Sequence, residues 1–389
     1  ILIPPLWSDQ NNMKFLLIYV PNLRFSYKGD WSKRKLNEIC QFFKGNGLSK
    51  SDLSNEGFPC ILYGELYTTY KNEVISDIIS KTNTTLSNPF LSRNNDLIIP
   101  GSGEDPIDIA VARAIYQNDI ILGGDLNILR PKSNVSAAFL SYQLNGVRRY
   151  DIAKKAQGKS IVHLHNSDLK EVLVSIPSYE EQLHIVKLLT KIDEMIEIQS
   201  KIIDRLYSQI KYIKGQILNM TTITETKPLG QLCNISTGKR DANEMKSNGS
   251  YKFFTCSKDD YCIDTYSFDG EALIISGNGE LGLIKYYNGK FDAYQRTYVL
   301  QNFKCHPKYL MYVLQNKLPK KIEKEKNVGA MPYIVLKTLT SINIDILNMH
   351  DQIKIVNILN KFEEKLENDR ILLELFEKEK SFLLKNLFV

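Results

Sequence analysis

The sequence predicts an α+β protein in which two β-rich domains form a pseudo-twofold tandem repeat, separated by two long helices that pair as an antiparallel coiled coil. The first observation behind this fold class is a repeat: Gln182–Val186 recurs as Gln352–Val356, 170 residues later. The second is that each copy opens a stretch of heptad-spaced apolar residues. The third is that short β-like runs and turn signals fill the sequence before each stretch.

Residues 1–20 are expected to be an N-terminal extension. Because the chain opens with Ile1, Met13 is the candidate natural start, and residues 1–12 are a fusion remnant or an alternative start. The longest apolar run here, Phe15–Val20, is too short to span a bilayer and has no small-residue cleavage pattern after it. We therefore expect no membrane segment and no secretion signal.

Residues 21–178 are expected to form the first β-rich domain. Runs such as Cys60–Tyr63 and Asp96–Ile99 alternate with turn signals, among them the Gly-Gly pair at 123–124. Short apolar runs bounded by such turn residues are typical of strands.

A central long helix is expected over residues 179–220. Pro177 and Ser178, followed by Glu180 and Glu181, are typical of a helix start. The predicted seam is Leu189, Ile192, Ile196, Ile203, Leu206, Ile210, Ile213 and Ile217. The steps of three and four alternate, and Gln199 occupies the one position that the apolar set skips.

The second β-rich domain is expected over residues 221–348, beginning with a polar linker at 221–228, and a C-terminal long helix over 349–389. Its seam repeats the first at the same offset: Leu359, Phe362, Leu366, Leu373, Phe376, Lys380, Leu383 and Leu387, with Asp369 at the skipped position. Buried polar residues such as Gln199, Asp369 and Lys380 cost stability but can fix register and orientation. The alternative is an ordinary helical hairpin on a larger core.

The repeat also extends into the β-rich domains. Phe139–Leu144 matches Tyr309–Leu314 at the offset of 170, and Leu97–Glu104 matches Leu273–Glu280 at 176. Between these anchors the two halves diverge. A common scaffold with different inserts indicates two related modules that face different targets.

Composition narrows the class of protein. The formal charge of +6 and the pI near 8.7 allow a nucleic-acid partner without requiring one. The six cysteines are scattered with no C-x-x-C pair, which is typical of a reducing, cytoplasmic protein without a zinc site or disulfide framework. His163 and His165 alternate as on a strand and have no further ligand nearby in the sequence, so we interpret them as structural.

Three short motifs resemble catalytic or cofactor sequences but fail on context. Gly277–Gly282 fits G-x-G-x-x-G, but a strand follows where a dinucleotide site needs a helix, so we predict a hairpin. Gly158–Ser160 resembles the end of a phosphate-binding loop, but Ala153 stands where its first glycine is required. Asn88–Phe90 lacks the second proline of the methyltransferase N-P-P-[FY] loop. We therefore expect no catalytic residue, no metal and no cofactor in this chain.

Basic residues follow each copy of the matched tyrosine-containing segment. They are Arg148, Arg149, Lys154, Lys155 and Lys159 in the first half and Lys317, Lys320, Lys321, Lys324 and Lys326 in the second. Lysine and arginine in this placement could neutralise DNA phosphates. Glu323 and Glu325 leave a solvated helix face as the alternative for the second set.

Base readout needs donors and acceptors on loops that can enter a groove. The candidates in the first half are Lys44, Lys50, Tyr63, Tyr67, Arg93, Asn94 and Arg113. The candidates in the second half are Lys239, Arg240, Lys258, Asn278, Gln295, Arg296 and Tyr298. For each tyrosine the alternative is packing within a strand.

Taken together, these segments resemble the specificity subunits of type I restriction-modification systems. The segments that carry the resemblance are Pro21–Phe25, Trp31–Leu36, Lys44–Ser49, Ile176–Pro177 with Glu181–Gln182 and the heptad helix, Thr237–Lys239, and Gly289–Tyr298. They span nearly the whole chain.

The resemblance implies a DNA-recognition subunit without catalysis of its own, in which each β-rich domain reads one half of a split, asymmetric double-stranded target. It implies two modification methyltransferase subunits as partners, which bind S-adenosylmethionine and methylate adenine N6. It also implies restriction/translocase subunits that use ATP. Two alternatives remain open: the specificity portion of a stand-alone methyltransferase system, and a coiled-coil scaffold without DNA readout.

Overall fold

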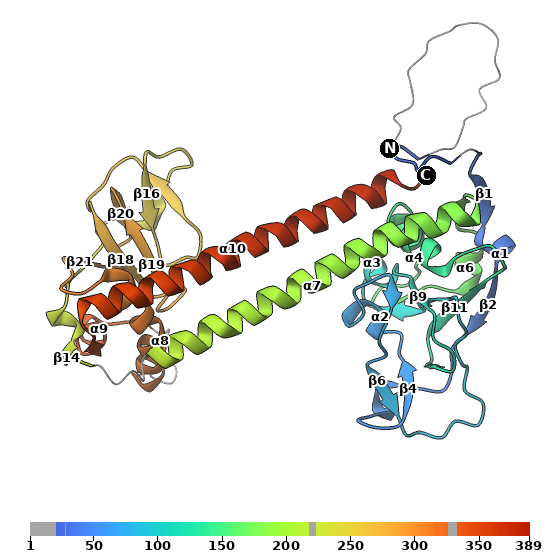
Figure 1. The fold of residues 1–389 in the computed structure, drawn as a ribbon, viewed down its shortest axis with the longest axis horizontal. Coiled ribbons are helices and arrows are strands. Elements are labelled where there is room, and N and C mark those ends of the chain that lie inside the picture. The colour runs from blue at the N-terminus through green and yellow to red at the C-terminus, as the bar shows by residue number, and fades with distance from the viewer. Residues whose placement is uncertain (1–20, 28, 218–222, 326–332) are drawn as a thin grey trace, which may run out of the picture. The chain divides into compact units, whose positions relative to one another are not determined.

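The computed structural model describes residues 21–27, 29–217, 223–325 and 333–389 (Figure 1). The chain divides into two compact units. Unit 1 contains the chain up to Ser200 together with Ile371–Val389, and unit 2 contains Lys201–Arg370. Each long helix therefore contributes one part to each unit.

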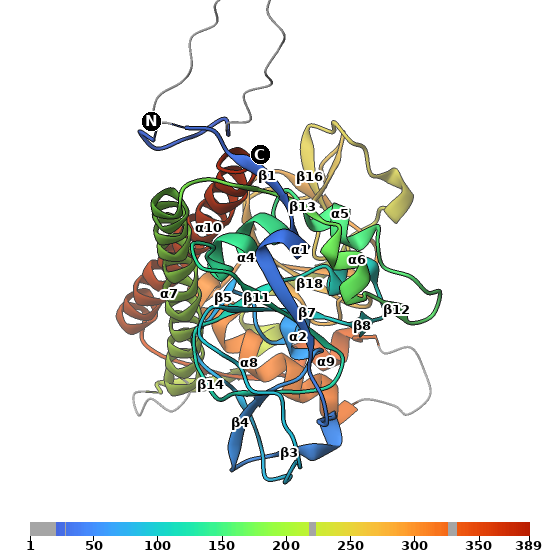
Figure 2. The same cartoon turned by 90° about the vertical axis from the view of Figure 1, so that its right-hand side faces the viewer.

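The centre of unit 1 is a five-stranded sheet. Its order is β2 (Cys40–Lys44), β11 (Leu126–Pro131), β7 (Asp96–Pro100), β9 (Arg113–Ile115) and β5 (Val74–Ile75). A four-stranded sheet has the order β10 (Ile121–Leu122), β4 (Phe58–Ile61), β6 (Ser80–Thr82) and β3 (Leu53–Ser54). Its strands β3 and β4 project beyond the larger sheet (Figure 2).

The described residues of unit 1 also form two strand pairs and seven short helices. β1 (Ser32–Lys35) pairs with β13 (Leu173–Ile176), and β8 (Ser102–Gly103) pairs with β12 (Val162–His163). The helices are α1 (Leu36–Ile39), η1 (Lys50–Asp52), α2 (Glu65–Thr68), α3 (Pro106–Ile109), α4 (Ala137–Asn145), α5 (Arg149–Ala153) and α6 (Asn166–Lys170). The hydroxyl of Ser136 caps α4 by accepting the Phe139 N–H at 3.3 Å, and this helix is buried along almost its whole length.

Unit 2 repeats the same central strands. Its four-stranded sheet has the order β15 (Asn234–Thr237), β21 (Thr297–Gln301), β18 (Glu271–Ser276) and β19 (Ile284–Asn288). A second sheet has the order β17 (Tyr261–Ile263), β16 (Tyr251–Phe254) and β20 (Phe291–Ala293), and β14 (Glu225–Pro228) pairs with β22 (Asn343–Ile346). The short helices are η2 (Leu229–Gln231), η3 (Ala242–Glu244), α8 (Pro307–Glu325) and α9 (Leu336–Thr340).

The two long helices are α7 (Tyr179–Ile217) and α10 (Met349–Asn386). In unit 1 Asp193 of α7 meets Lys380 of α10, and in unit 2 Leu206 of α7 packs with Leu366 of α10. Since the numbers rise along one helix as they fall along the other, the helices are antiparallel, which confirms the predicted coiled coil. The predicted seam positions are buried or half-buried wherever their side chains are described.

Two features differ from the sequence-based expectations, and a third agrees with them. The expected linker at 221–228 contains strand β14, because its backbone pairs with β22. The second basic stretch lies on the tyrosine-containing helix itself, because α8 continues to Glu325, whereas Gly146 ends α4 in unit 1. The G-x-G-x-x-G segment forms the turn between β18 and β19, which confirms the predicted hairpin.

Candidate nucleic-acid interface

In each unit, three antiparallel strands finish at a pair of glycines. In unit 1 the Gly45 N–H donates to the Leu126 carbonyl at 3.0 Å, and the Gly101 N–H donates to the Asp125 carbonyl at 2.6 Å. In unit 2 the Gly238 N–H donates to the Thr297 carbonyl at 3.0 Å, and the Gly277 N–H donates to the Arg296 carbonyl, also at 3.0 Å. We call this edge of each unit its glycine end.

Glycine is required at this edge because two backbone segments approach closely. A Cβ atom at Gly45 would lie 2.0 Å from the Gly123 carbonyl oxygen, and one at Gly238 would lie 2.0 Å from the Ala293 carbonyl oxygen. Any side chain would force the strands apart. The close approach brings the loops on either side of these glycines together.

A third segment joins the glycine end in both units. The Leu164 N–H donates to the Gly101 carbonyl at 2.9 Å, and the Ile334 N–H donates to the Gly277 carbonyl at 2.8 Å. Leu164 and Ile334 are 170 positions apart, so the repeat seen in the sequence also holds for the hydrogen bonds of this edge.

Five of the predicted contacts in unit 1 lie at or beside the glycine end: Lys44, Lys50, Tyr63, Tyr67 and Lys159. Lys50 and Tyr63 line a cavity of about 720 Å³ together with Gly124 and Asp125. On the same rim Glu65 accepts the Leu62 N–H at 2.7 Å and the Ser80 hydroxyl. Lys44, Lys50 and Lys159 are exposed and cationic, as phosphate contacts would need to be.

Six predicted contacts in unit 2 lie at its glycine end: Lys239, Arg240, Lys258, Asn278, Gln295 and Arg296. Two of them have partners within the protein. The Arg240 Nε lies 3.1 Å from the Asp292 carboxylate, and this hydrogen bond raises the pKa of Arg240. The Lys258 ammonium lies 3.6 Å from the Glu280 carboxylate.

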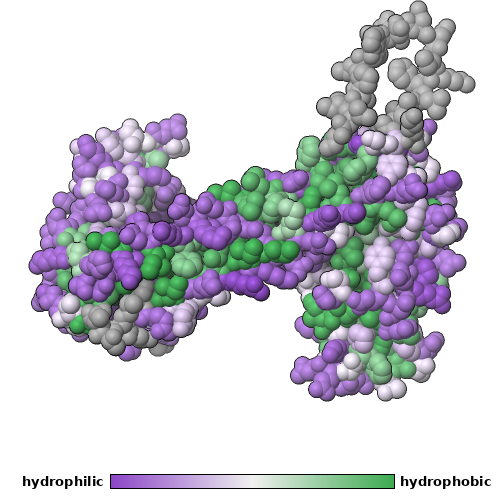
Figure 3. Space-filling view, viewed as in Figure 1, coloured by the Kyte–Doolittle hydropathy of each residue, from purple (hydrophilic) through white to green (hydrophobic). Residues whose placement is uncertain are grey.

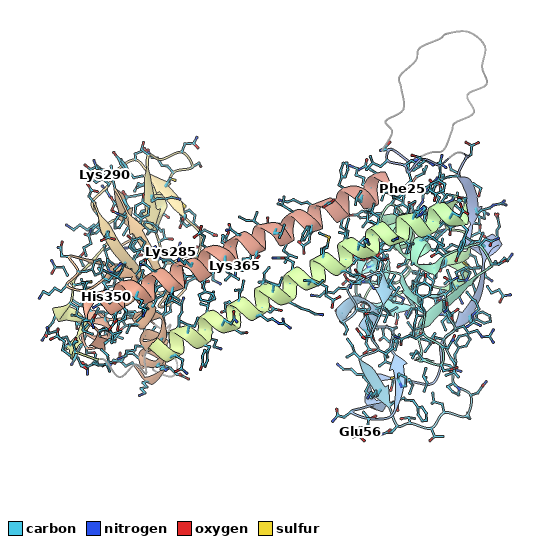
Figure 4. The ribbon with its side chains drawn as sticks, viewed as in Figure 1. Phe25, Glu56, Lys285, Lys290, His350 and Lys365 are labelled. Carbon is cyan, nitrogen blue, oxygen red and sulfur yellow. The ribbon has the colours of Figure 1, made fainter. Side chains whose placement is uncertain are left out.

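Other lysines of unit 2 are engaged within the fold. The Lys285 ammonium donates to the Lys258 carbonyl at 2.7 Å and to the Asp260 carboxylate at 2.9 Å. Lys290 is labelled in Figure 4. Its ammonium lies 4.6 Å from the centre of the Tyr266 ring. Positive charge alone therefore does not identify the interface, whereas an unpaired cation at the glycine end is a stronger candidate.

Two predicted contacts are interior residues, and for these the structure corrects the sequence analysis. The Arg113 side chain is buried, its Nε donates to the Leu66 carbonyl at 3.1 Å, and burial lowers its pKa. The Tyr298 side chain is also buried, and its hydroxyl donates to the Ile334 carbonyl at 2.8 Å. Neither side chain can reach DNA without unfolding its surroundings.

The remaining predicted contacts of unit 1 lie elsewhere. Arg93 and Asn94 precede β7, at the opposite end of that strand from Gly101. Arg148 donates to the Val389 carbonyl at 2.8 Å, and Arg149 to the Ile107 carbonyl at 3.1 Å, so both hold parts of the fold together.

The two basic stretches lie on different elements. Lys154 and Lys155 follow α5, on the path to Leu164. Lys320, Lys321 and Lys324 lie on α8, and Lys321 pairs with Glu325 at 2.9 Å. Lys317 pairs with Asp345 at 2.5 Å. Lys326 lies outside the described residues.

The sequence analysis missed Asp125, which is exposed at the glycine end of unit 1. Its carboxylate accepts the Ser102 hydroxyl at 3.1 Å. Aligning Gly124–Asp125 with Gln295–Arg296, which also directly precede a central strand, would have identified it.

The described residues contain no group of three metal-ligating side chains, and no described helix is long and apolar enough to cross a membrane. The cysteines are free thiols. Burial raises the pKa of Cys40 to about 12 and that of Cys60 to about 11, so these two thiols stay protonated at neutral pH.

Comparison with known families gives a match over most of the chain. Residues 28–208 and 224–376 each match the type I restriction modification DNA specificity domain. The EcoDI type I restriction enzyme specificity subunit of Escherichia coli is 35% identical over 150 residues, which cover 39% of this chain and 33% of that protein. The MjaVIII type I restriction enzyme specificity subunit of Methanocaldococcus jannaschii is 21% identical over 401 residues, covering 90% of each.

A solved structure shares the fold. The crystal structure of a type I restriction-modification S subunit from M. genitalium superposes with a TM-score of 0.69 at 19% identity, covering 95% of this chain and 99% of that chain.

Proposed function

Because the chain belongs to the family of type I restriction-modification DNA specificity subunits, whose role is DNA recognition rather than catalysis, we propose that its two units read the two halves of a split, asymmetric DNA target. The observation that carries this proposal is the glycine end. The backbone hydrogen bonds described above are made in both units, but the side chains presented there differ. One scaffold with two sets of readers suits a target whose halves differ in sequence.

Phosphate contacts would position each unit on the duplex. The candidates for these contacts are the exposed lysines Lys44, Lys50 and Lys159 in unit 1 and Lys239 in unit 2. Such contacts set orientation and make binding dependent on salt, but they carry no sequence information. Base identity would be read by other side chains at the glycine end that can donate to or accept from base edges.

The coiled coil would act as the spacer between the half-sites. Helix α7 has 39 residues and α10 has 38, so each is about 58 Å long at 1.5 Å per residue. Half-sites about one duplex turn apart are separated by roughly 34 Å, which a rigid element of this length can bridge.

Each long helix has an exposed apolar pair of residues at its start, at equivalent positions of the repeat. Tyr179 and Leu183 are exposed on the first turns of α7, and Met349 and Ile353 are exposed at the equivalent positions of α10, 170 residues later. Figure 3 shows hydrophobic side chains exposed along both long helices. Residues four apart on a helix share a face, so each pair forms one small docking surface. We call these pairs the helix-start surfaces.

Two apolar helix-start surfaces at equivalent positions of the repeat suit two copies of one partner. We assign them to two modification methyltransferase subunits, which would bind S-adenosylmethionine and methylate adenine N6 after flipping the base out of the stack. Restriction subunits that use ATP would join the same complex. The role of this chain would be to recognise the DNA target and to bind the partner subunits at that target.

The test is to co-express the chain with its cognate methyltransferase in a host without adenine methylation and to map methylated adenines by long-read sequencing. A single split motif that disappears when this chain is omitted supports the proposal. A purified complex that methylates without sequence preference would instead indicate a scaffold. Methylation by this chain alone would indicate a stand-alone enzyme.

A further inference from the structure

We propose that Asp125 and Arg296 are the equivalent base-reading residues of the two units, and that they read opposite chemistry. Arg296 would read a guanine in the half-site of unit 2, and Asp125 would read the amino group of a cytosine in the half-site of unit 1. This inference rests on the proposed function, because it names the readers within that interface.

The backbone shows that the two residues are equivalent. The Asp125 carbonyl accepts the Gly101 N–H, and the Arg296 carbonyl accepts the Gly277 N–H. The residue that follows each of them begins a central strand, β11 in unit 1 and β21 in unit 2. The carbonyl of that residue accepts the N–H of the other glycine, Gly45 or Gly238. The two residues therefore occupy equivalent positions in the hydrogen-bonded scaffold, and both side chains are exposed.

The two side chains differ in how they are held. Asp125 has a φ of 55°, in the left-handed region that aspartate and asparagine adopt more readily than most residues. The Ser102 hydroxyl donates to its carboxylate at 3.1 Å, which orients one oxygen and leaves the other open. A carboxylate fixed in this way can accept a hydrogen bond from a base edge.

Arg296 is available in a way that its neighbour Arg240 is not. Arg240 is held by Asp292 and Glu244, at 3.1 and 3.2 Å. Within the described part of the chain, the guanidinium of Arg296 has no ion pair or hydrogen bond. Its backbone is fixed on both sides, since its carbonyl also accepts the Cys256 thiol at 3.3 Å. Arg296 therefore has a fixed backbone and a free guanidinium. This combination suits a side chain that hydrogen-bonds to DNA.

The chemistry of the two groups assigns the bases. A guanidinium donates two parallel hydrogen bonds to O6 and N7 of guanine, which is the commonest specific contact in the major groove. A carboxylate accepts from N4 of cytosine and is repelled by the acceptor edge of guanine. Replacing the reader should therefore change one base position in one half of the target.

The experiment uses the full chain in its complex with the methyltransferase and compares methylation motifs. Arg296→Gln should reduce the preference for guanine by roughly tenfold or more at one position, in favour of adenine, because glutamine pairs with N6 and N7 of adenine. Asp125→Asn should relax one cytosine in the other half, and asparagine keeps the backbone conformation. The matched control is Lys239→Gln, which should weaken methylation at every site equally, as loss of a phosphate contact does.

The main arm of a second measurement uses the unchanged complex, so it does not depend on how well a variant folds. Duplexes carrying 7-deazaguanine, which lacks N7, at the identified position should bind the unchanged complex roughly tenfold more weakly and the Arg296→Gln complex no more weakly than normal duplex. A split motif that both substitutions leave unchanged, or uniform weakening with no change of base, would overturn the reader assignment alone. The absence of any split motif with the unchanged chain would overturn the proposed function and this inference with it.

Discussion

Gln182 and Gln352 make the same pair of hydrogen bonds at equivalent places in the two units. The Gln182 side chain accepts the Ser136 N–H at 2.9 Å and donates to the Pro177 carbonyl at 3.1 Å. The Gln352 side chain accepts the His306 N–H at 2.8 Å and donates to the Leu347 carbonyl at 2.7 Å. Both are buried, so each long helix is tied near its start to the short helix that covers the central sheet of its unit.

Replacing Gln352 with Leu should lower the free energy of unfolding by about 1–3 kcal/mol, because it leaves the part-buried His306 N–H and the buried Leu347 carbonyl without partners. The matched control is Asn357→Leu, which changes an exposed residue of the same helix and should shift stability by less than about 0.5 kcal/mol. Urea denaturation followed by circular dichroism measures both. Equal effects of the two substitutions would show that the buried hydrogen bonds contribute nothing.

Lys380 is the one cation in the predicted seams, and its ammonium lies 2.7 Å from both the Asp193 and the Glu73 carboxylates. Burial opposes its charge, but these two carboxylates keep the pKa of Lys380 above its ordinary value. Lys380→Met should destabilise the protein by about 3–5 kcal/mol at pH 7, because two buried carboxylates then face each other uncompensated. The triple variant that also carries Asp193→Asn and Glu73→Gln should recover most of the loss in the same urea measurement.

The loss caused by Lys380→Met should also depend on pH. Burial raises the pKa of Asp193 in the folded chain, and Lys380 partly opposes that rise. Without the ammonium the folded state holds a proton on this carboxyl more tightly than the unfolded state, whose aspartates titrate near pH 3.9. The stability of the variant therefore falls as pH rises above that value. Unfolding curves from pH 4.5 to pH 7 should show the gap between variant and parent widening, and a constant gap would contradict this account.

Gly238→Ala tests whether the glycine end is needed for reading DNA. The added Cβ would lie 2.0 Å from the Ala293 carbonyl oxygen, so the segment that follows β15 must move away from the end of β20. We expect the bases in the half of the methylation motif read by unit 2 to become less specific, while the bases in the other half stay the same. The matched control is Gly215→Ala on α7, where a Cβ meets nothing within 4 Å and should stabilise the helix by roughly 0.5–1 kcal/mol. Retention of the whole motif in Gly238→Ala would show that the edge tolerates movement.

The long helices could be predicted because the spacing of their apolar residues directly indicates which side chains are buried. A residue every three or four positions faces the partner helix, so the sequence alone indicated that Gln199, Asp369 and Lys380 would lie in the seam. What it could not give was the partners of Lys380, since Glu73 comes from a loop three hundred residues away. The pairing of β3, β4, β6 and β10 was missed for the same reason: these strands are short and their partners are not local.

The candidate contacts were predicted less well, because residue type does not show which way a side chain points. Arg113 is a cation, but Val111, Ala112, Ala114 and Ile115 around it form an apolar run, and that context indicated a buried strand. Asp125 was missed because the offset between the halves changes from 176 to 170 near it. The backbone hydrogen bonds show that Asp125 is the equivalent of Arg296 in the other unit.

The helix-start surfaces predict a stepwise loss of partners. Leu183 and Ile353 are each 43% exposed and 170 positions apart, and an aspartate at either would place a charge in the centre of an apolar contact. Each single substitution should leave a complex with one methyltransferase copy, and the double substitution should leave none, as native mass spectrometry of co-expressed subunits would show. The matched control is Ile198→Asp, which changes an exposed apolar residue of α7 outside these surfaces and should leave two copies bound. If both copies stay bound to the double variant, the partners dock elsewhere on this chain.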